Sequence, residues 1–444
     1  MISLISKARL LNDKKIMDNI NKAVKFIYIF LIAYICLLPF YYYPAGCFTV
    51  LKIPLIKYFP LILIAALFAV SPVKPSFRVK PAKEDTLKLC VLFYFFLTLF
   101  SGLGTAYYPT SIFKAAYYAA TGLLIYFIIS SWDLRVALKV YFLRSIVFIG
   151  FLVSLYGIIT LLLGKDPLFG YLQYSKSNLI EPGIWLKMGR ISSSLGNPLF
   201  LGGFLSLLFP ISVYLYLLNQ KEKKFAGILM AGQAVVIFLG SLLTFSIGAL
   251  ASIMFFYVYY RWKIKKSYNA SSAYKNGGLF LFLGAVLCCF ILFALAANVF
   301  SLIYHNNYIF GNFLGKIHFE KITNIQGISL RWDSLKYTAV FLKTLGAFFG
   351  AGIGKIGTGE CYLSRVSLGN YLGLSLVESG VFATIALLLV FWAAIIKASG
   401  SKDDPVYAFL RASICILFIN MLFFDALNQP VIRIIFWSFV GFLA

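Results

Sequence analysis

The segment from Gly189 to Gly203 carries residue types suited to holding a phosphate group: Arg190, three serines, and then Asn197-Pro198 ahead of an apolar run. Asn-Pro favours a turn and a helix start, because proline is preferred at the first helical position. The N–H groups of a helix start and a guanidinium both bind phosphate oxygens well. A plain helix cap with an interfacial arginine is the structural alternative, and the residues alone leave both open.

Further candidates lie in the C-terminal half. Arg331 is a second group able to bind an anion, and Glu378 lies within an apolar run, where an ionised side chain is costly and often functional. Asn370 would line the outer mouth of the same helix. His318 and Glu360 precede that run and can act as a base toward an acceptor hydroxyl. The structural alternatives are a polar partner on a neighbouring helix for Glu378, helix capping for Asn370, and simple solvation for the other two.

The elements that position these residues are expected to be helices in a membrane. Of the 444 residues, 61% are hydrophobic and 12% are charged, and the mean hydropathy is +0.88. Soluble domains are about half apolar and about a quarter charged, so lipid must be the solvent of this chain. The apolar runs are continuous and do not alternate, which favours helices over a β-barrel. We expect an all-α integral membrane protein in which residues 1–444 form a single polytopic domain.

The number of spans follows from the apolar runs, since a spanning helix needs about 20 residues. About twelve transmembrane helices are expected, at 24–44, 54–71, 87–105, 111–130, 137–163, 197–218, 225–242, 244–260, 277–300, 369–396, 406–426 and 428–443. The stretch 225–260 is too long for one span and is expected to break near Thr244-Phe245-Ser246.

Lysine and arginine predict the orientation. They gather in alternate segments, whereas Lys52 is the one basic residue of the short loops on the other side, so both termini are expected in the cytoplasm. Two extracytoplasmic loops, 164–196 and 301–368, are long and basic, which indicates an anionic partner at the outer face. Asp333–Phe349 has apolar residues at helical spacing and predicts an amphipathic helix at that interface. The net charge of +25 is spread over loops and does not indicate nucleic acid.

The last outer turn carries opposite charges on its two sides. Asp425 and Arg433 are candidates to pair with each other there. The cysteines show no metal-ligand spacing, and no metal or cofactor is expected.

Three segments together resemble the O-antigen ligase and O-antigen polymerase family of membrane glycosyltransferases. They occur in that family's order, between the expected spans, and they comprise Gly189–Gly203, Ser329-Leu330-Arg331-Trp332 with the later Gly350-Ala351-Gly352-Ile353-Gly354, and Gly369–Gly380. The resemblance covers roughly residues 189–390, and the span layout extends it along the chain.

Two departures from the family pattern concern the proposed chemistry. Gly369 stands where the ligases commonly carry a histidine, and Thr244-Phe245-Ser246-Ile247 lacks the arginine that usually follows Thr-x-Ser. The missing histidine favours a polymerase or a divergent transferase over a lipopolysaccharide ligase.

The resemblance implies a transferase without a nucleotide sugar, in the bacterial cytoplasmic (inner) membrane. Its donor would be a glycan on undecaprenyl pyrophosphate, and its acceptor a hydroxyl of a glycan or lipid at the outer face. Arg190 and Arg331 would hold the pyrophosphate, Glu378 and Asn370 would be catalytic, and His318 or Glu360 would serve the acceptor. The sugar, the acceptor and the choice between ligation and polymerisation stay open.

Two alternatives belong to other functional classes. A secondary transporter or polysaccharide flippase predicts discontinuous helices and ionisable residues near the midplane, which Glu378 partly satisfies. A non-catalytic scaffold of envelope assembly predicts that Arg190 and Arg331 can be replaced without effect.

Overall fold

The computed structural model describes residues 86–103, 108–130, 136–163, 190–220, 224–264, 336–353, 370–400 and 405–444, with a few isolated positions besides. Within these ranges the regular structure is helical and no strand occurs. The chain is therefore a helical membrane protein in the part that the structure describes, as the continuous apolar runs predict.

Six of the described helices are long and apolar enough to cross a membrane. They are α4 (Tyr108–Ser130), α5 (Val136–Leu163), α7 (Pro198–Gln220), α8 (Lys224–Leu243), α14 (Gly380–Gly400) and α15 (Pro405–Phe423). Shorter helices are α3 (Thr86–Leu99), α9 (Ile247–Tyr259), α13 (Tyr371–Glu378) and α16 (Pro430–Leu443). The runs predicted at 24–44, 54–71 and 277–300 lie outside the described residues, apart from isolated positions.

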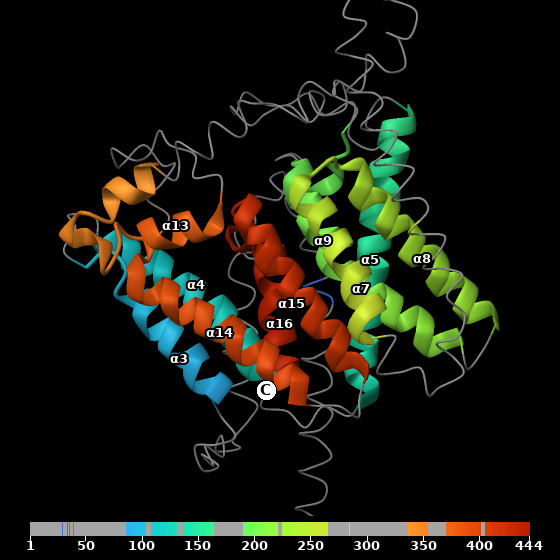
Figure 1. The fold of residues 1–444 in the computed structure, drawn as a ribbon, viewed down its shortest axis with the longest axis horizontal. Helices are drawn as coiled ribbons and strands as arrows, with labels where there is room; N and C mark the ends of the chain where they lie inside the picture. Colours follow the sequence, from blue (N-terminus) through green and yellow to red (C-terminus); the bar gives the residue numbers. More distant parts are fainter. Residues whose placement is uncertain are drawn as a thin grey trace, which may run out of the picture.

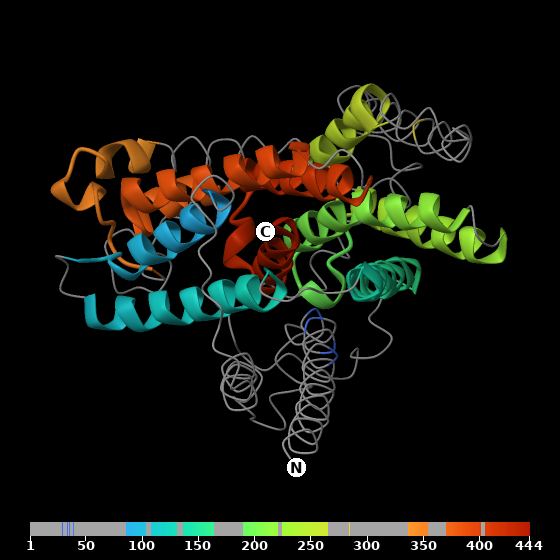
Figure 2. The ribbon, with the colours of Figure 1, turned by 90° about the horizontal axis from the view of Figure 1, so that it is seen from below.

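The helices form a bundle in which α7 and α16 are largely buried. Figure 1 shows α3, α4 and α14 on one side and α5, α7, α8 and α9 on the other, with α15 and α16 between them. In the turned view of Figure 2, α16 and α7 lie between α4 and α5 below and α14 and α15 above. Every residue of α16 from Val431 to Leu443 is buried. Apart from Arg433 and Ser438 this helix is apolar all round, as expected in such a central position.

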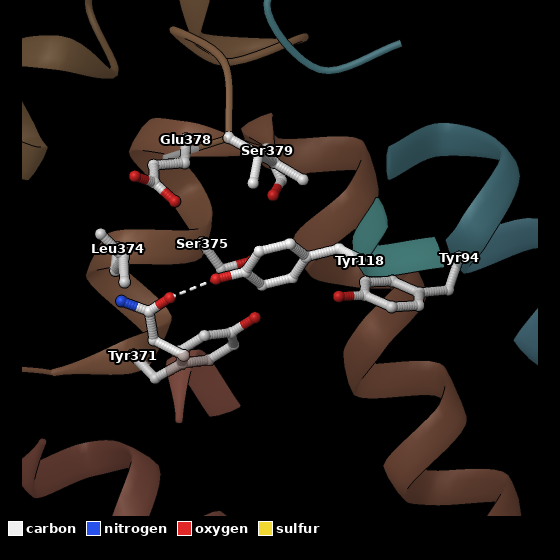
Figure 3. Close-up of a pocket in the computed structure, with 9 residues that line it drawn as sticks. Tyr94, Tyr118, Tyr371, Leu374, Ser375, Glu378 and Ser379 are labelled. Atoms are coloured by element: carbon white, nitrogen blue, oxygen red, sulfur yellow. Dashed lines mark hydrogen bonds between the residues drawn. The ribbon is translucent and has the colours of Figure 1, made fainter. Parts of the chain in front are cut away.

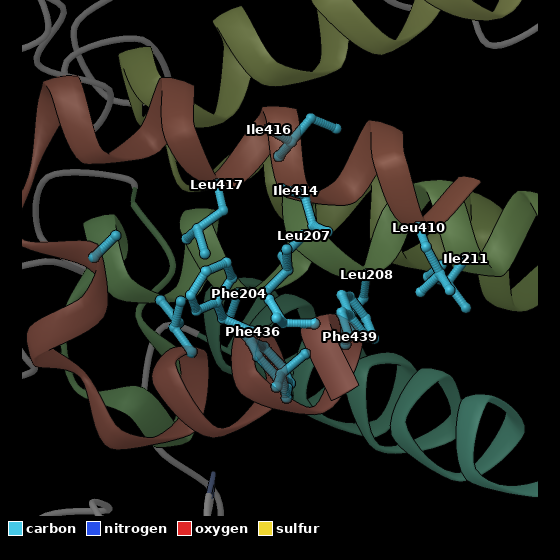
Figure 4. Packing of buried hydrophobic residues seen from close by; sticks show 14 of the residues in the cluster. Phe204, Leu207, Leu208, Ile211, Leu410, Ile414, Ile416, Leu417, Phe436 and Phe439 are labelled. Carbon is cyan, nitrogen blue, oxygen red and sulfur yellow. The ribbon is translucent and has the colours of Figure 1, made fainter. Parts of the chain in front are cut away.

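The centre of the bundle is filled by side chains from α7, α15 and α16, which interlock in Figure 4. Those shown include Phe204, Leu207, Leu208 and Ile211 of α7, Leu410, Ile414 and Leu417 of α15, and Phe436 and Phe439 of α16. Lipid is as apolar as these side chains, so close packing rather than the hydrophobic effect holds helices together in a membrane. Their shape fit is therefore the main source of cohesion.

A polar contact adds specificity to this packing. The Asn420 amide nitrogen of α15 donates to the hydroxyls of Ser206 on α7 and Ser252 on α9, each at 3.0 Å. All three side chains are fully buried. Such bonds between membrane helices contribute about 0.6 to 2 kcal/mol and fix which faces meet.

Two predicted helix boundaries have different outcomes. The break expected near Thr244-Phe245-Ser246 is confirmed, since α8 ends at Leu243, α9 starts at Ile247, and Phe245 has a positive φ of 48°. The single span expected at 369–396 is wrong, because α13 ends at Glu378 and α14 begins at Gly380. Gly380 has a φ of 85°, which breaks the helix. The candidate span therefore starts after Glu378, and this carboxylate belongs to the end of the bundle rather than to a spanning helix.

Candidate functional site

A small pocket opens at the end of the bundle where α13 lies. Its lining comes from α3, α4, α13, the segment before α13 and the turn between α15 and α16, and consists of Tyr94, Tyr118, Ile353, Tyr371, Leu374, Ser375, Glu378, Ser379 and Asn428. Figure 3 shows three tyrosine rings on one side of this space and Glu378 with Ser379 on the other. The pocket thus combines phenol and serine hydroxyls, an amide and a carboxylate on a largely apolar bundle.

Glu378 is the last residue of α13, and its side chain is only 8% exposed. The turn at Gly350–Gly352 fixes the backbone here: the Ala351 N–H donates to Val377 O at 2.7 Å, and the Gly352 N–H donates to Glu378 O at 2.9 Å. These bonds satisfy carbonyls that the helix end leaves without intrahelical partners. The turn therefore sets the position of the pocket's carboxylate.

Glycine is required on both sides of this contact. Gly350 and Gly380 have positive φ values of 76° and 85°. A Cβ at Gly350 would lie 2.3 Å from Glu378 O, and one at Gly380 would lie 2.2 Å from Phe348 O. The second and third family-like segments of the sequence are thus packed directly against each other.

Asn370 begins α13 as its N-cap. Its side-chain oxygen accepts a hydrogen bond from the Gly373 N–H at 2.6 Å, as capping asparagines do. Asn370 is not among the residues that line the pocket. The structure thus shows the capping role, which positions Tyr371 and Glu378 on the short helix.

Tyr118 connects the pocket to the turn between α15 and α16. Its hydroxyl donates to the Asn428 amide oxygen at 2.5 Å, and the Asn428 amide nitrogen donates to an Asp425 carboxylate oxygen at 3.3 Å. Burial raises the pKa of the Asp425 carboxyl above its usual value of 3.8, and the bond from Asn428 opposes this increase. A polar chain therefore runs from the pocket into the turn.

Arg433 lies behind the same tyrosine. Its guanidinium carbon is 3.7 Å from the centroid of the Tyr118 ring, and the side chain is 4% exposed. Among the described residues, no group accepts a hydrogen bond from its Nε and Nη1 atoms. The expected direct pair with Asp425 is wrong, because Arg433 faces the Tyr118 ring while Asp425 bonds to Asn428. A cation on a desolvated ring is worth about 2 kcal/mol.

Arg190 occupies a different part of the same end. Its Nε donates to Thr244 O at 2.9 Å, and the next residue, Ile191, donates its N–H to Leu243 O at 3.2 Å. Arg190 therefore lies against the break between α8 and α9, across the α15–α16 pair from α13 (Figure 1). Burial lowers the pKa of its guanidinium to about 10, which still leaves it charged at neutral pH.

The serines after Arg190 are folded inward rather than presented to a ligand. Ser193 has a positive φ of 50°, and its hydroxyl donates to Val153 O of α5 at 2.6 Å.

The helix start predicted from Asn197-Pro198 is confirmed, since α7 begins at Pro198 and the Asn197 side-chain oxygen accepts from the Leu199 N–H at 2.8 Å.

Several predicted site residues are not placed relative to this pocket. Arg331, His318 and Glu360 lie outside the described residues. Among the described residues, no group of three histidine, cysteine, aspartate or glutamate side chains could hold a metal ion.

The structure adds pocket residues that sequence reasoning did not single out, notably Tyr94, Tyr118 and Asn428. They come from three separate elements, so no spacing in the sequence connects them. Tyrosines are common at the ends of membrane helices, so the sequence alone does not distinguish those that line a site from those that lie at the membrane interface.

The class of this protein is inferred from its fold and its pocket, because the comparisons with family models and curated proteins give no match. The fold and the site define a helical membrane protein with a hydroxyl-rich pocket and one carboxylate at one end of its bundle.

Proposed function

We propose that this protein is a membrane glycosyltransferase of cell-surface polysaccharide assembly, similar to O-antigen ligases and polymerases. The observation that carries the proposal is the pocket in which Glu378 faces tyrosine and serine side chains. Donors, acceptors and aromatic rings together suit a sugar, because a sugar presents hydroxyl groups at its edge and C–H groups on its faces. Two of the family-like segments supply residues to this pocket, Ile353 from one and Tyr371 to Ser379 from the other, which supports the same function.

The proposed topology places the pocket at the outer face of a bacterial cytoplasmic membrane. About twelve spans, cytoplasmic termini and the two long extracytoplasmic loops are part of this proposal. The charges at the far end of the bundle support it: Arg261 and Lys263 follow α9, and Lys397 lies in the last turn of α14. Positive charge at that end is typical of the cytoplasmic side.

The proposed reaction transfers a glycan from undecaprenyl pyrophosphate to an acceptor hydroxyl on a glycan or lipid. The hydroxyl oxygen bonds to the anomeric carbon, and the bond from that carbon to the pyrophosphate oxygen breaks. The lipid pyrophosphate leaves with the bonding electron pair, and the hydroxyl proton passes to a base. Glu378 is the described residue best placed to be that base, since it is the carboxylate of the pocket.

Arg190 and Arg331 are proposed to bind the pyrophosphate. Two guanidiniums can neutralise the charge that shifts onto the leaving group in the transition state. The bond from Arg190 Nε to Thr244 O orients this guanidinium, so its entropy cost on binding is reduced. Asn370 contributes by holding α13, and His318 and Glu360 remain candidates on the acceptor side.

The experiment replaces Arg190 and Arg331 by alanine, singly and together, in the source cells and compares their lipid-linked glycans by gel electrophoresis and mass spectrometry. The proposal predicts accumulated short lipid-linked units and loss of mature polymer. Arg261→Ala is a matched control, because this exposed arginine lies at the opposite end of the bundle. Normal polymer in both single variants and in the double variant would refute the proposal.

A specific observation also favours a second candidate, a secondary transporter or polysaccharide flippase. Transporters build substrate sites from discontinuous helices, and α13 and α14 are such a pair with Glu378 at the break. This candidate predicts unchanged glycan length with substrate retained on the cytoplasmic side. Measuring the sidedness of lipid-linked glycans in membrane vesicles from the same variants separates the two functions.

A further inference from the structure

The segment 336–353 crosses the pocket end of the bundle and has an unusual surface. It forms a helical turn over 336–341 and a 3-10 turn, η5 (Leu345–Ala347), before the Gly350–Gly352 turn. The helix predicted over Asp333–Phe349 is therefore shorter in the described residues and ends at 341. We refer to residues 336–353 as the strap.

The strap exposes large apolar side chains, although it lies outside the spanning helices. The exposed set consists of Tyr337, Val340, Leu342, Phe348 and Phe349, with Phe348 49% exposed. Several large apolar side chains exposed on one short segment indicate a surface that meets something other than water.

These side chains continue a surface that already faces lipid. Phe348 stacks on Phe382 of α14, with ring centroids 5.5 Å apart, and Phe349 contacts the same ring edge-on at 6.2 Å. Phe382 begins an exposed stripe along the spanning helix α14, which continues with Ile385, Leu389, Trp392 and Ile396. The steps of three and four residues place this stripe on one face of the helix. The strap phenylalanines extend it to the end of α14.

We propose that the strap is an anchor that docks on the interfacial layer of the bilayer, with its phenylalanines at the acyl boundary. Lys336 and Lys343 are exposed on the same segment. Their positive charges can bind the phosphate groups of lipids. Aromatic and basic side chains together are typical of segments that lie in this layer.

Docking of the strap on lipid also fixes the position of the pocket, and this effect does not depend on which reaction the pocket performs. The strap is bonded to the turn after α3 through the Gly102 N–H, which donates to Phe349 O at 2.8 Å. Two and three residues later it is bonded to the end of α13 through the Ala351 and Gly352 N–H groups. Docking of the strap on lipid therefore holds the backbone of Glu378 at a fixed depth relative to the membrane.

The first test measures depth with the full chain in nanodiscs made from lipids brominated at defined acyl positions. The Phe348→Trp variant, after subtraction of the wild-type signal, is expected to be quenched more by bromines near the headgroup than by bromines near the chain end. Native Trp392 lies ten residues beyond Phe382 on α14, about 15 Å along the helix, and provides a deeper reference. Quenching of the introduced tryptophan by aqueous acrylamide, with none from either lipid, would overturn the proposal.

The second test measures the link to the pocket by hydrogen–deuterium exchange. In the double variant Phe348→Ser with Phe349→Ser, the amides of Ala351 and Gly352 are expected to exchange at least about tenfold faster, because interfacial burial of two rings is lost. Phe225→Ser removes another exposed ring, at the far end of α8, and serves as the control, with no change at these amides expected. Unchanged exchange in the double variant would contradict the link. Because neither measurement uses enzymatic activity, the result is independent of the transferase proposal.

Discussion

At the residue scale, the pocket depends on two ionisable side chains that lie behind its wall, Arg433 and Asp425. Tyr118 separates them: its ring faces the guanidinium of Arg433, and its hydroxyl reaches Asp425 through Asn428. The tyrosine is therefore held from both sides. This arrangement fixes a pocket wall that a single tyrosine on a lipid-exposed helix could not hold alone.

The pH dependence of stability tests the burial of Asp425. Because its folded pKa is raised above the usual 3.8, Asp425 contributes stability below about pH 4 that is lost as the pH rises through the folded pKa. We expect Asp425→Asn to gain thermal stability relative to the wild type as the pH is raised from about 4 to about 7. Unfolding midpoints in detergent at several pH values give this difference. A difference that is constant with pH would contradict the prediction.

The cap of α13 offers a second residue-scale prediction. Asn370→Ala removes the acceptor of the Gly373 N–H and is expected to cost about 1 kcal/mol of unfolding free energy. Asn370→Asp retains an acceptor and should cost less. Thermal unfolding of the purified variants measures both. If Asn370 itself took part in chemistry, Asn370→Asp would lose activity without losing stability.

At the element scale, the break between α13 and α14 gives the site its shape. We expect Gly380→Ala to destabilise the protein by more than about 1–2 kcal/mol, since the left-handed backbone alone costs that much and the new Cβ also overlaps Phe348 O. Gly232→Ala on α8 is the matched control, because nothing lies within 4 Å of its added Cβ. It should be neutral or stabilising by up to about 1 kcal/mol. Equal unfolding midpoints for the two variants would argue against a strained break.

The same break shows what the sequence can and cannot predict. The ends of α4, α5, α7, α8 and α15 follow from apolar runs to within a few residues, because lipid demands a minimum helix length. The run through Gly380 looks equally continuous, yet it breaks because Phe348 O and the Gly350 turn occupy the space beside it. The sequence therefore predicts Glu378 within a spanning helix, whereas the structure places it at the break between α13 and α14. The tyrosines of the pocket come from different helices, and only their packing reveals them.

At the scale of the whole molecule, the account requires that both termini share one side of the membrane and that the strap lies on the other. A green fluorescent protein fused after Ala444 should fluoresce, because it folds in the cytoplasm. Alkaline phosphatase fused after Ile353 should be active, because it needs export to fold. The opposite pattern, or activity at neither position, would contradict the proposed topology.

Reconstitution of the purified protein measures the proposed glycan transfer itself. Purified protein in proteoliposomes would be given the lipid-linked oligosaccharide extracted from its own source, with released undecaprenyl pyrophosphate and glycan length followed in time. We expect release of the lipid pyrophosphate together with longer or transferred glycan, and a rate lower by about two to four orders of magnitude for Glu378→Gln. Glu378→Gln at the wild-type rate would remove the proposed base. Absence of any release by the wild-type protein, with the oligosaccharide instead moved unchanged across the bilayer, would contradict the transferase and identify a flippase.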